Sequence, residues 1–243
     1  MWTRSLLKSN AKNVLGHHYW HAFLVCIVTS FFCSSGATAG STYVQKMESS
    51  DYMFTQLWEQ YGFLFLGFTL FAFAAALAFT FFISGAVEVG CDRYFMESRV
   101  GNAPFATLFS VFGSPDYWNV IKIIFMRSVY IFLWSLLFLI PGIIKSFEYI
   151  AIPYILAENP GLPSERAFTL SRQMTNGEKG AIFILGLSFF GWLLLGALAF
   201  GIGILFVEPY IQATFAELYA ALRAKAFAAG YTDANELGDF VRY

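Results

Sequence analysis

Charged residues are scarce in this 243-residue sequence. Asp, Glu, Lys and Arg make up 13% of it, about half the share found in soluble domains. The 15 basic and 16 acidic residues nearly cancel, so the chain lacks the basic excess that nucleic-acid binding needs. Cysteine is scarce too, and the spacing of Cys26, Cys33 and Cys91 suits neither a zinc site nor a disulfide framework. We expect no nucleic-acid partner, metal or cofactor.

Common enzyme motifs are also missing. The sequence contains no P-loop, no Gly-x-Ser-x-Gly elbow and no zinc-protease histidine pair. Its acidic residues are scattered along the chain rather than gathered at one place. These observations predict a non-catalytic protein.

Hydrophobic residues are abundant, at 58% of the chain. Roughly 20 apolar helical residues cross the hydrocarbon core of a bilayer. Brief Gly-rich or Pro-Gly segments between apolar runs predict tight hairpins. The fold class predicted is all-α, a polytopic transmembrane bundle of about six helices in three hairpins. The apolar runs cover residues 19–36, 62–87, 120–140, 143–157, 181–200 and 202–222.

The basic residues predict how the chain is oriented, because cytoplasmic loops are enriched in Lys and Arg. Basic residues precede the first run, lie between the second and third and between the fourth and fifth, and follow the last. Both termini are therefore expected in the cytoplasm. Residues 1–225 would form one integral-membrane domain, and residues 226–243 a cytoplasmic tail.

The N-terminus has a second interpretation. Its basic start, the apolar residues 22–33 and Ala37-Thr38-Ala39 together resemble a cleavable signal peptide. Against cleavage, the segment before the apolar stretch is long, and residues 4–15 have the pattern of an amphipathic helix. A similar helix is predicted at residues 164–174, with Ser164 as its N-cap. The apolar faces consist of Leu7, Ala11, Val14 and Leu15 in the first helix, and Ala167, Leu170 and Met174 in the second.

Two of the predicted hairpins have related sequences. Residues 134–157 and 192–213 share the order Trp-x-Leu-Leu, Gly-Ile, Pro-Tyr-Ile-x-Ala, which predicts an internal repeat. Repeats of this kind occur in transporters, but duplication alone does not imply transport. In the fifth run, Gly186, Gly191 and Gly196 predict close contact between helices.

The chain also resembles a bacterial integral-membrane family known only as domain of unknown function 975. The most specific segment is residues 140–160, which reads Ile-Pro-Gly-Ile-Ile-Lys and then Pro-Tyr-Ile-Leu-Ala-Glu-Asn-Pro. The resemblance implies a multi-pass protein of the bacterial cytoplasmic membrane and brings no assigned activity. Further matching residues are Gly85–Gly90, Arg93–Phe95, Pro104-Phe105, Leu108-Phe109, Leu170–Arg172, Ser188-Phe189, Gly191-Trp192, Gly201–Gly203 and Pro209-Tyr210.

Charged residues inside apolar runs are candidate functional groups, because an unpaired charge in hydrocarbon costs several kcal/mol. Glu148 and Glu208 are predicted at matched depth, with Lys145 one turn from Glu148. These three residues are the candidate intramembrane polar site, for a proton, a cation or a lipid amine. The alternative is an ion pair that only fixes helix packing.

Nearer the cytoplasm, Arg127 needs a partner, and Glu88 and Glu217 are the candidates. A packing pair is again the simpler interpretation.

Two functional hypotheses follow. In the first, the protein organises membrane lipid, a protein partner or a second copy of itself through a cytoplasmic surface. In the second, it is a small transporter or channel that uses Lys145, Glu148 and Glu208. The residues of the predicted surface are Arg93, Arg99, Arg166, Arg172 and Lys179.

Overall fold

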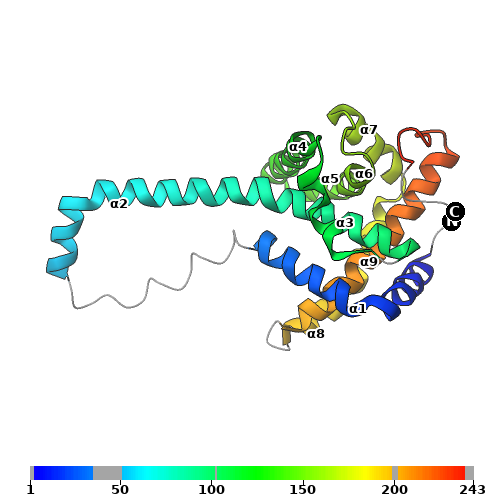
Figure 1. Cartoon of the computed structure of the whole chain (residues 1–243), viewed down its shortest axis with the longest axis horizontal. Coiled ribbons are helices and arrows are strands. Elements are labelled where there is room, and N and C mark those ends of the chain that lie inside the picture. The colour runs from blue at the N-terminus through cyan, green and yellow to red at the C-terminus, as the bar shows by residue number, and fades with distance from the viewer. Residues whose placement is uncertain (1–2, 35–50, 102, 199–201, 239–243) are drawn as a thin grey trace.

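The computed structural model describes residues 3–34, 51–101, 103–198 and 202–238, and each regular element in these ranges is helical (Figure 1). The predicted all-α class is therefore confirmed. A π-helical turn, η1 (Thr80–Ser84), follows α2, and a 3-10 segment, η2 (Phe105–Gly113), precedes α4. The α-helices are α1 (Arg4–Ser34), α2 (Asp51–Phe79), α3 (Gly85–Val100), α4 (Tyr117–Leu137), α5 (Leu139–Glu148), α6 (Ile152–Glu158), α7 (Ser164–Thr175), α8 (Lys179–Leu198) and α9 (Ile202–Ala228).

The core of the molecule forms around α3 and α9. Helix α3 packs against η2, α6, α1, α4 and α9, and α9 packs in turn against α1 and α8. Helix α6 is buried along its whole length. Tyr94, Phe95, Tyr149 and Phe189 are the largest fully buried side chains. Apolar side chains buried in this way exclude solvent and fix the helices against one another.

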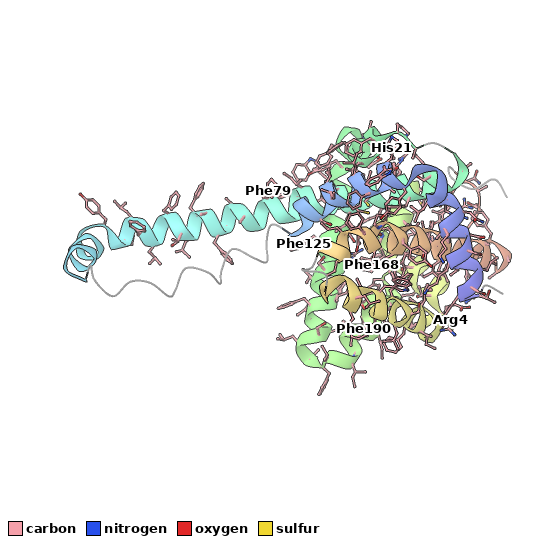
Figure 2. The ribbon with its side chains drawn as sticks, turned by 90° about the horizontal axis from the view of Figure 1, so that it is seen from below. Arg4, His21, Phe79, Phe125, Phe168 and Phe190 are labelled. Atoms are coloured by element: carbon pink, nitrogen blue, oxygen red, sulfur yellow. The ribbon has the colours of Figure 1, made fainter. Side chains whose placement is uncertain are left out.

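Helix α2 projects away from this core (Figure 1). Its side chains point outward on both sides of the helix (Figure 2), and Phe63, Phe68 and Phe71 are 69–88% exposed. A helix that is apolar on every side needs lipid or protein around it.

Three helical stretches are long and apolar enough to cross a bilayer, judged by length and composition. They are Tyr117–Leu137, Leu139–Glu158 and Lys179–Ala197, and they correspond to the third, fourth and fifth predicted runs. The first two runs contain the shorter apolar helices Tyr19–Ser30 and Tyr61–Ala76. The structure thus supports a membrane protein with three candidate membrane-spanning helices.

The fourth run is interrupted. Helix α5 ends at Glu148, the backbone turns, and α6 starts at Ile152. Pro153 accounts for the break, because proline has no amide hydrogen and its ring excludes the carbonyl four residues earlier. That carbonyl, on Tyr149, instead accepts a 3.3 Å hydrogen bond from the Ile152 amide.

The two predicted amphipathic helices pack inside the protein. Residues 4–15 continue without a break into the first apolar run as α1, which packs on α9, and Val14 of the predicted face is only half-buried. Helix α7 confirms the second prediction, with Ala167, Leu170 and Met174 fully buried. Ser164 is its first helical residue rather than its N-cap, a position held by Pro163.

The sequence predicts the end of the membrane domain at residue 225, which lies inside a continuous helix in the structure. Helix α9 continues through it to Ala228. The following residues fold back on the bundle, where Leu237 is fully buried and the Asn159 side-chain amide donates to the Glu236 carbonyl. A buried apolar side chain and this hydrogen bond hold the segment against the bundle.

Candidate functional site

Glu148 lies at the centre of a cluster of cations. Its carboxylate is 2.9 Å from Lys145 Nζ, 2.8 Å from Lys179 Nζ and 3.0 Å from Arg172 Nε. Glu148 itself is buried, whereas Arg172 is the most exposed of the three cations. One buried carboxylate thus draws together the side chains of three helices.

Helix ends bring these side chains together. Lys145 lies in the last turn of α5, Arg172 in the last turn of α7, and Lys179 begins α8. The Ser171 hydroxyl donates a 2.7 Å hydrogen bond to the Glu148 carbonyl, which satisfies one of the free carbonyls at the end of α5. The end of α5 is thereby fixed against α7.

Beside the cluster lies a hollow of about 500 Å³ between α4, α5 and α7. Its aromatic wall includes Tyr130, Trp134 and Tyr149. Lys145 Nζ lies 5.5 Å from the centre of the Trp134 ring and 5.6 Å from that of Tyr149, within the range of cation–π attraction.

The hollow also carries a surplus of positive charge. Of the charged residues that the structure describes, Lys145, Arg172 and one acid, Glu165, line it. The Arg172 guanidinium donates a 3.1 Å hydrogen bond to the Tyr149 hydroxyl, and this bond raises the pKa of Arg172 above its usual value. With Lys179 included, three basic side chains accompany the carboxylates of Glu148 and Glu165. The arrangement suits an anionic group such as a phosphate.

The predicted intramembrane site is only partly assembled. The Lys145–Glu148 pair forms, and Glu208 lies apart from it. Helix α5 is short, so Glu148 meets Lys179 at the start of α8. Glu208 lies on α9 and accepts a 2.9 Å hydrogen bond from Gln212 of the same helix. Gly203, five residues before Glu208, packs against Gly196 near the other end of α8.

The second prediction is also half right. Arg127 Nη2 lies 2.7 Å from Glu88 Oε1, so one of its two candidate partners is confirmed. Glu217 is not a partner of Arg127 in the structure. It pairs with Arg99 at 2.6 Å and accepts a hydrogen bond from Asn10, because α9 packs against both α1 and α3.

The five cations of the predicted cytoplasmic surface do not act as one patch. Arg93 pairs with Glu97 at 3.2 Å, Arg99 with Glu217 at 2.6 Å, and Arg166 with Glu236 at 2.5 Å. Each of these three is neutralised by its own carboxylate. Arg172 and Lys179 instead share Glu148 with Lys145, so the predicted surface divides into separate ion pairs and one cluster.

Sequence reasoning missed two buried acids. Glu158 forms an ion pair with Arg223 at 3.0 Å, and both side chains are almost fully buried. Asp92 is buried on α3, one helical turn after Glu88. The available signals were the position of Glu158 in the most specific segment of the family resemblance, and the four-residue spacing of Glu88 and Asp92 on one helix face.

Comparison with known proteins agrees with the resemblance seen in the sequence. No curated protein and no solved structure matches the chain. The family model described as "Protein of unknown function (DUF975)" matches residues 136–226. This segment contains Lys145, Glu148, Arg172 and Lys179, the whole of the cation cluster. From the last turn of α4 almost to the end of α9, the chain matches the DUF975 family, as the resemblance predicted.

Proposed function

We propose that this chain is a non-catalytic protein of the bacterial cytoplasmic membrane that binds the phosphate of an anionic lipid in the hollow between α4, α5 and α7. The observation that carries the proposal is the cluster in which Lys145, Arg172 and Lys179 share the carboxylate of Glu148 beside an aromatic wall. The proposal includes a multi-pass topology with both termini in the cytoplasm and two repeated hairpins.

Phosphate binding fits the chemistry of the cluster. Lys and Arg form charge-assisted hydrogen bonds with phosphate oxygens, and Arg can present two donors at once. Arg172 is about half exposed, at 53% of its side-chain surface, so it is accessible to a ligand. Tyr and Trp are the residues enriched where acyl chains meet headgroups, which fits the wall that Tyr130 and Trp134 form.

The neighbouring hairpin supports contact between the hollow and lipid chains. At the tip between α4 and α5, Leu136, Phe138, Leu139 and Ile140 are 71–74% exposed. Seven residues separate Phe138 from Lys145, which is about 10 Å of helix. An apolar tip of this kind is stable in hydrocarbon, and Lys145 would then lie toward the headgroups.

Bound lipid would connect α4 and α5 to α7, which is how the protein would organise lipid around itself. The exposed apolar surface of α2 leaves room for a protein partner or a second copy of the chain. The transporter hypothesis is less well supported, because the structure separates Glu208 from Glu148 and Lys145.

Native mass spectrometry after mild detergent extraction tests the proposal. The purified protein is offered phosphatidylglycerol and phosphatidylcholine, and we expect wild type to retain phosphatidylglycerol preferentially. Arg172→Gln removes a charge-assisted hydrogen bond and should weaken retention about tenfold. Lys145→Gln and Lys179→Gln should act in the same direction.

Arg93→Gln is the matched control, because Arg93 is also a paired cation but lies outside the hollow. It should retain phosphatidylglycerol as wild type does. Two results would contradict lipid binding at this cluster. One is equal retention of the two lipids by wild type, and the other is unchanged retention by a triple variant in which Lys145, Arg172 and Lys179 are all replaced.

A further inference from the structure

A second cavity, of about 330 Å³, lies between α3, α4, the α5–α6 turn and α9. Its polar wall consists mainly of Glu88, Asp92, Arg127, Tyr154 and Gln212. Glu88 is partly exposed, with 36% of its side-chain surface accessible, whereas Asp92 and Tyr154 are buried. The cavity therefore has an accessible acid at one part of its wall and a buried acid at another.

The charges in this cavity do not balance when both acids are ionised. Among the described residues, Arg127 is the only cation that lines it, and it already pairs with Glu88 at 2.7 Å. Asp92 is hydrogen-bonded to Tyr154, a neutral partner. Asp92 must therefore hold a proton or face a second cation, because an isolated buried carboxylate is costly.

The polar wall is also incompletely satisfied. Arg127 Nε is buried and has no hydrogen-bond partner among the described residues. Buried donors without a partner are uncommon in folded proteins, and a bound polar molecule is one way to satisfy them. An occupant that carries a hydrogen-bond acceptor beside its charged group would satisfy this donor.

The remaining wall favours an organic molecule. Phe147, Tyr149 and Phe215 supply aromatic surface, and aromatic rings attract organic cations through their faces. A volume of about 330 Å³ is far more than one metal ion occupies and lies within the range of small-molecule pockets.

We propose that this cavity binds a small organic ammonium compound, with its charge between Glu88 and Asp92 and its apolar part against the aromatic rings. The two acids lie four residues apart on one face of α3, so both can approach a single ammonium group. This site is independent of the proposed lipid site, although Tyr149 lines both hollows.

Binding at this site is coupled to a proton. Burial, and then the nearby Glu88 carboxylate, raise the pKa of Asp92 well above its usual value, whereas Arg127 and the hydrogen bond from Tyr154 oppose this rise. An ammonium group beside Asp92 supplies the missing positive charge. The carboxyl group then releases its proton to the buffer, and the net charge of the cavity does not change.

The charged and titratable groups around Asp92 come from several helices. Glu88 lies on α3 itself, Arg127 on α4 and Tyr154 on α6. Helix α9 contributes Gln212, which does not titrate and donates its hydrogen bond to Glu208.

Isothermal titration of the full-length protein in detergent with benzylammonium tests the proposal. We expect saturable binding to wild type, with benzyl alcohol, Na⁺ and K⁺ each binding at least tenfold more weakly. Titration in two buffers of different ionisation enthalpy should show about one proton released per benzylammonium bound. Asp92→Asn keeps a hydrogen-bond acceptor for Tyr154, and should weaken binding about tenfold and abolish proton release.

The matched control is Glu97→Gln, which removes another α3 carboxylate that pairs with Arg93 outside the cavity. It should bind benzylammonium as wild type does. The proposal is wrong if wild type does not bind benzylammonium, binds benzyl alcohol or an alkali cation equally well, or releases no proton. The proton-release measurement needs only wild type, so it tests the proposal even if Asp92→Asn fails to fold.

Discussion

Gly90 is a residue whose lack of a side chain allows two segments to touch. A Cβ atom at this position would lie 2.0 Å from the Leu108 carbonyl oxygen and 2.7 Å from its carbon. Both are backbone atoms, so a side-chain rotation cannot relieve the clash. The contact joins α3 to η2, and α3 carries Glu88 and Asp92.

We therefore predict that Gly90→Ala destabilises the protein by about 1–3 kcal/mol, the usual cost of overpacking. Thermal unfolding in one detergent measures this change. Gly16→Ala is the control, since no atom lies within 4 Å of the added Cβ. Alanine is the better helix former by about 0.5–1 kcal/mol, so Gly16→Ala should raise the unfolding temperature slightly. Equal effects of the two substitutions would contradict the steric explanation.

At the residue scale, sequence reasoning succeeded where a lone charge required a partner. Arg127 lies within an apolar run, and the need to pair it led directly to Glu88. The same reasoning could not find the partner of Glu148 across the chain, because Arg172 and Lys179 lie in polar segments where a charge needs no explanation. Asp92 was missed because it lies beyond the end of the second apolar run and beside Arg93, where a charge needs no explanation.

At the scale of elements, helix type was easier to predict than helix packing. The apolar period of α7 predicted both the helix and the face that is buried. The glycines of α8 show the limit, because only Gly196 contacts another helix, through Gly203, whereas Gly186 and Gly191 face open space. All three glycines lie among apolar residues, so the sequence does not show which of them lies where α8 and α9 cross.

The segment after α9 is held to α7 by a two-point ion pair. Arg166 donates to the two carboxylate oxygens of Glu236 at 2.5 and 2.7 Å. The hydrogen bond from Arg166 lowers the pKa of Glu236, burial opposes this shift, and a hydrogen bond from Thr232 assists it. Ionised Glu236 is thus favoured by folding. Its contribution is fully present above the usual pKa of 4.5 and is lost as the pH falls through the lower folded value.

We predict that Glu236→Gln lowers the free energy of unfolding by about 1 kcal/mol at pH 7, as expected for a partly exposed bidentate pair. The difference from wild type should shrink as the pH falls below about 4.5. Thermal unfolding across this pH range measures it, and limited proteolysis at pH 7 should cut the variant faster after residue 228. A difference that stays constant down to the folded pKa would show that ionisation of Glu236 plays no part.

At the scale of the whole molecule, the α4–α5 and α8–α9 hairpins extend to different distances from the cation cluster. Residues 128–144 and 180–207 contain no Asp, Glu, Lys or Arg. Lys179 starts α8 and lies 2.8 Å from Glu148, so the start of α8 and the end of α5 lie at the same height along the helix bundle. From that level α8 extends for 20 residues, about 30 Å, whereas α5 extends only about 15 Å.

This difference predicts two insertion depths. If the cluster lies among the headgroups, the end of α8 reaches the far side of a hydrocarbon core about 30 Å thick, and the tip between α4 and α5 stops near its middle. Sequence hydrophobicity alone could not predict that one hairpin crosses the core and the other stops near its middle, because both hairpins are apolar and similar in sequence. The break before Pro153 makes the difference by ending α5 at Glu148.

Nitroxide labels at Leu139→Cys and Leu195→Cys, in a background with the three native cysteines replaced by alanine, measure these depths in vesicles. Both positions are exposed on the protein, at 72% and 61%. Oxygen should collide with both labels more often than a polar nickel chelate does. The Leu139 label should be the deeper one, near the bilayer centre, and the Leu195 label should lie closer to the opposite leaflet. As a control, a label at Ser164→Cys on α7 should collide with the nickel chelate more often than with oxygen. Equal depth for the two hairpin labels would contradict a short α4–α5 hairpin.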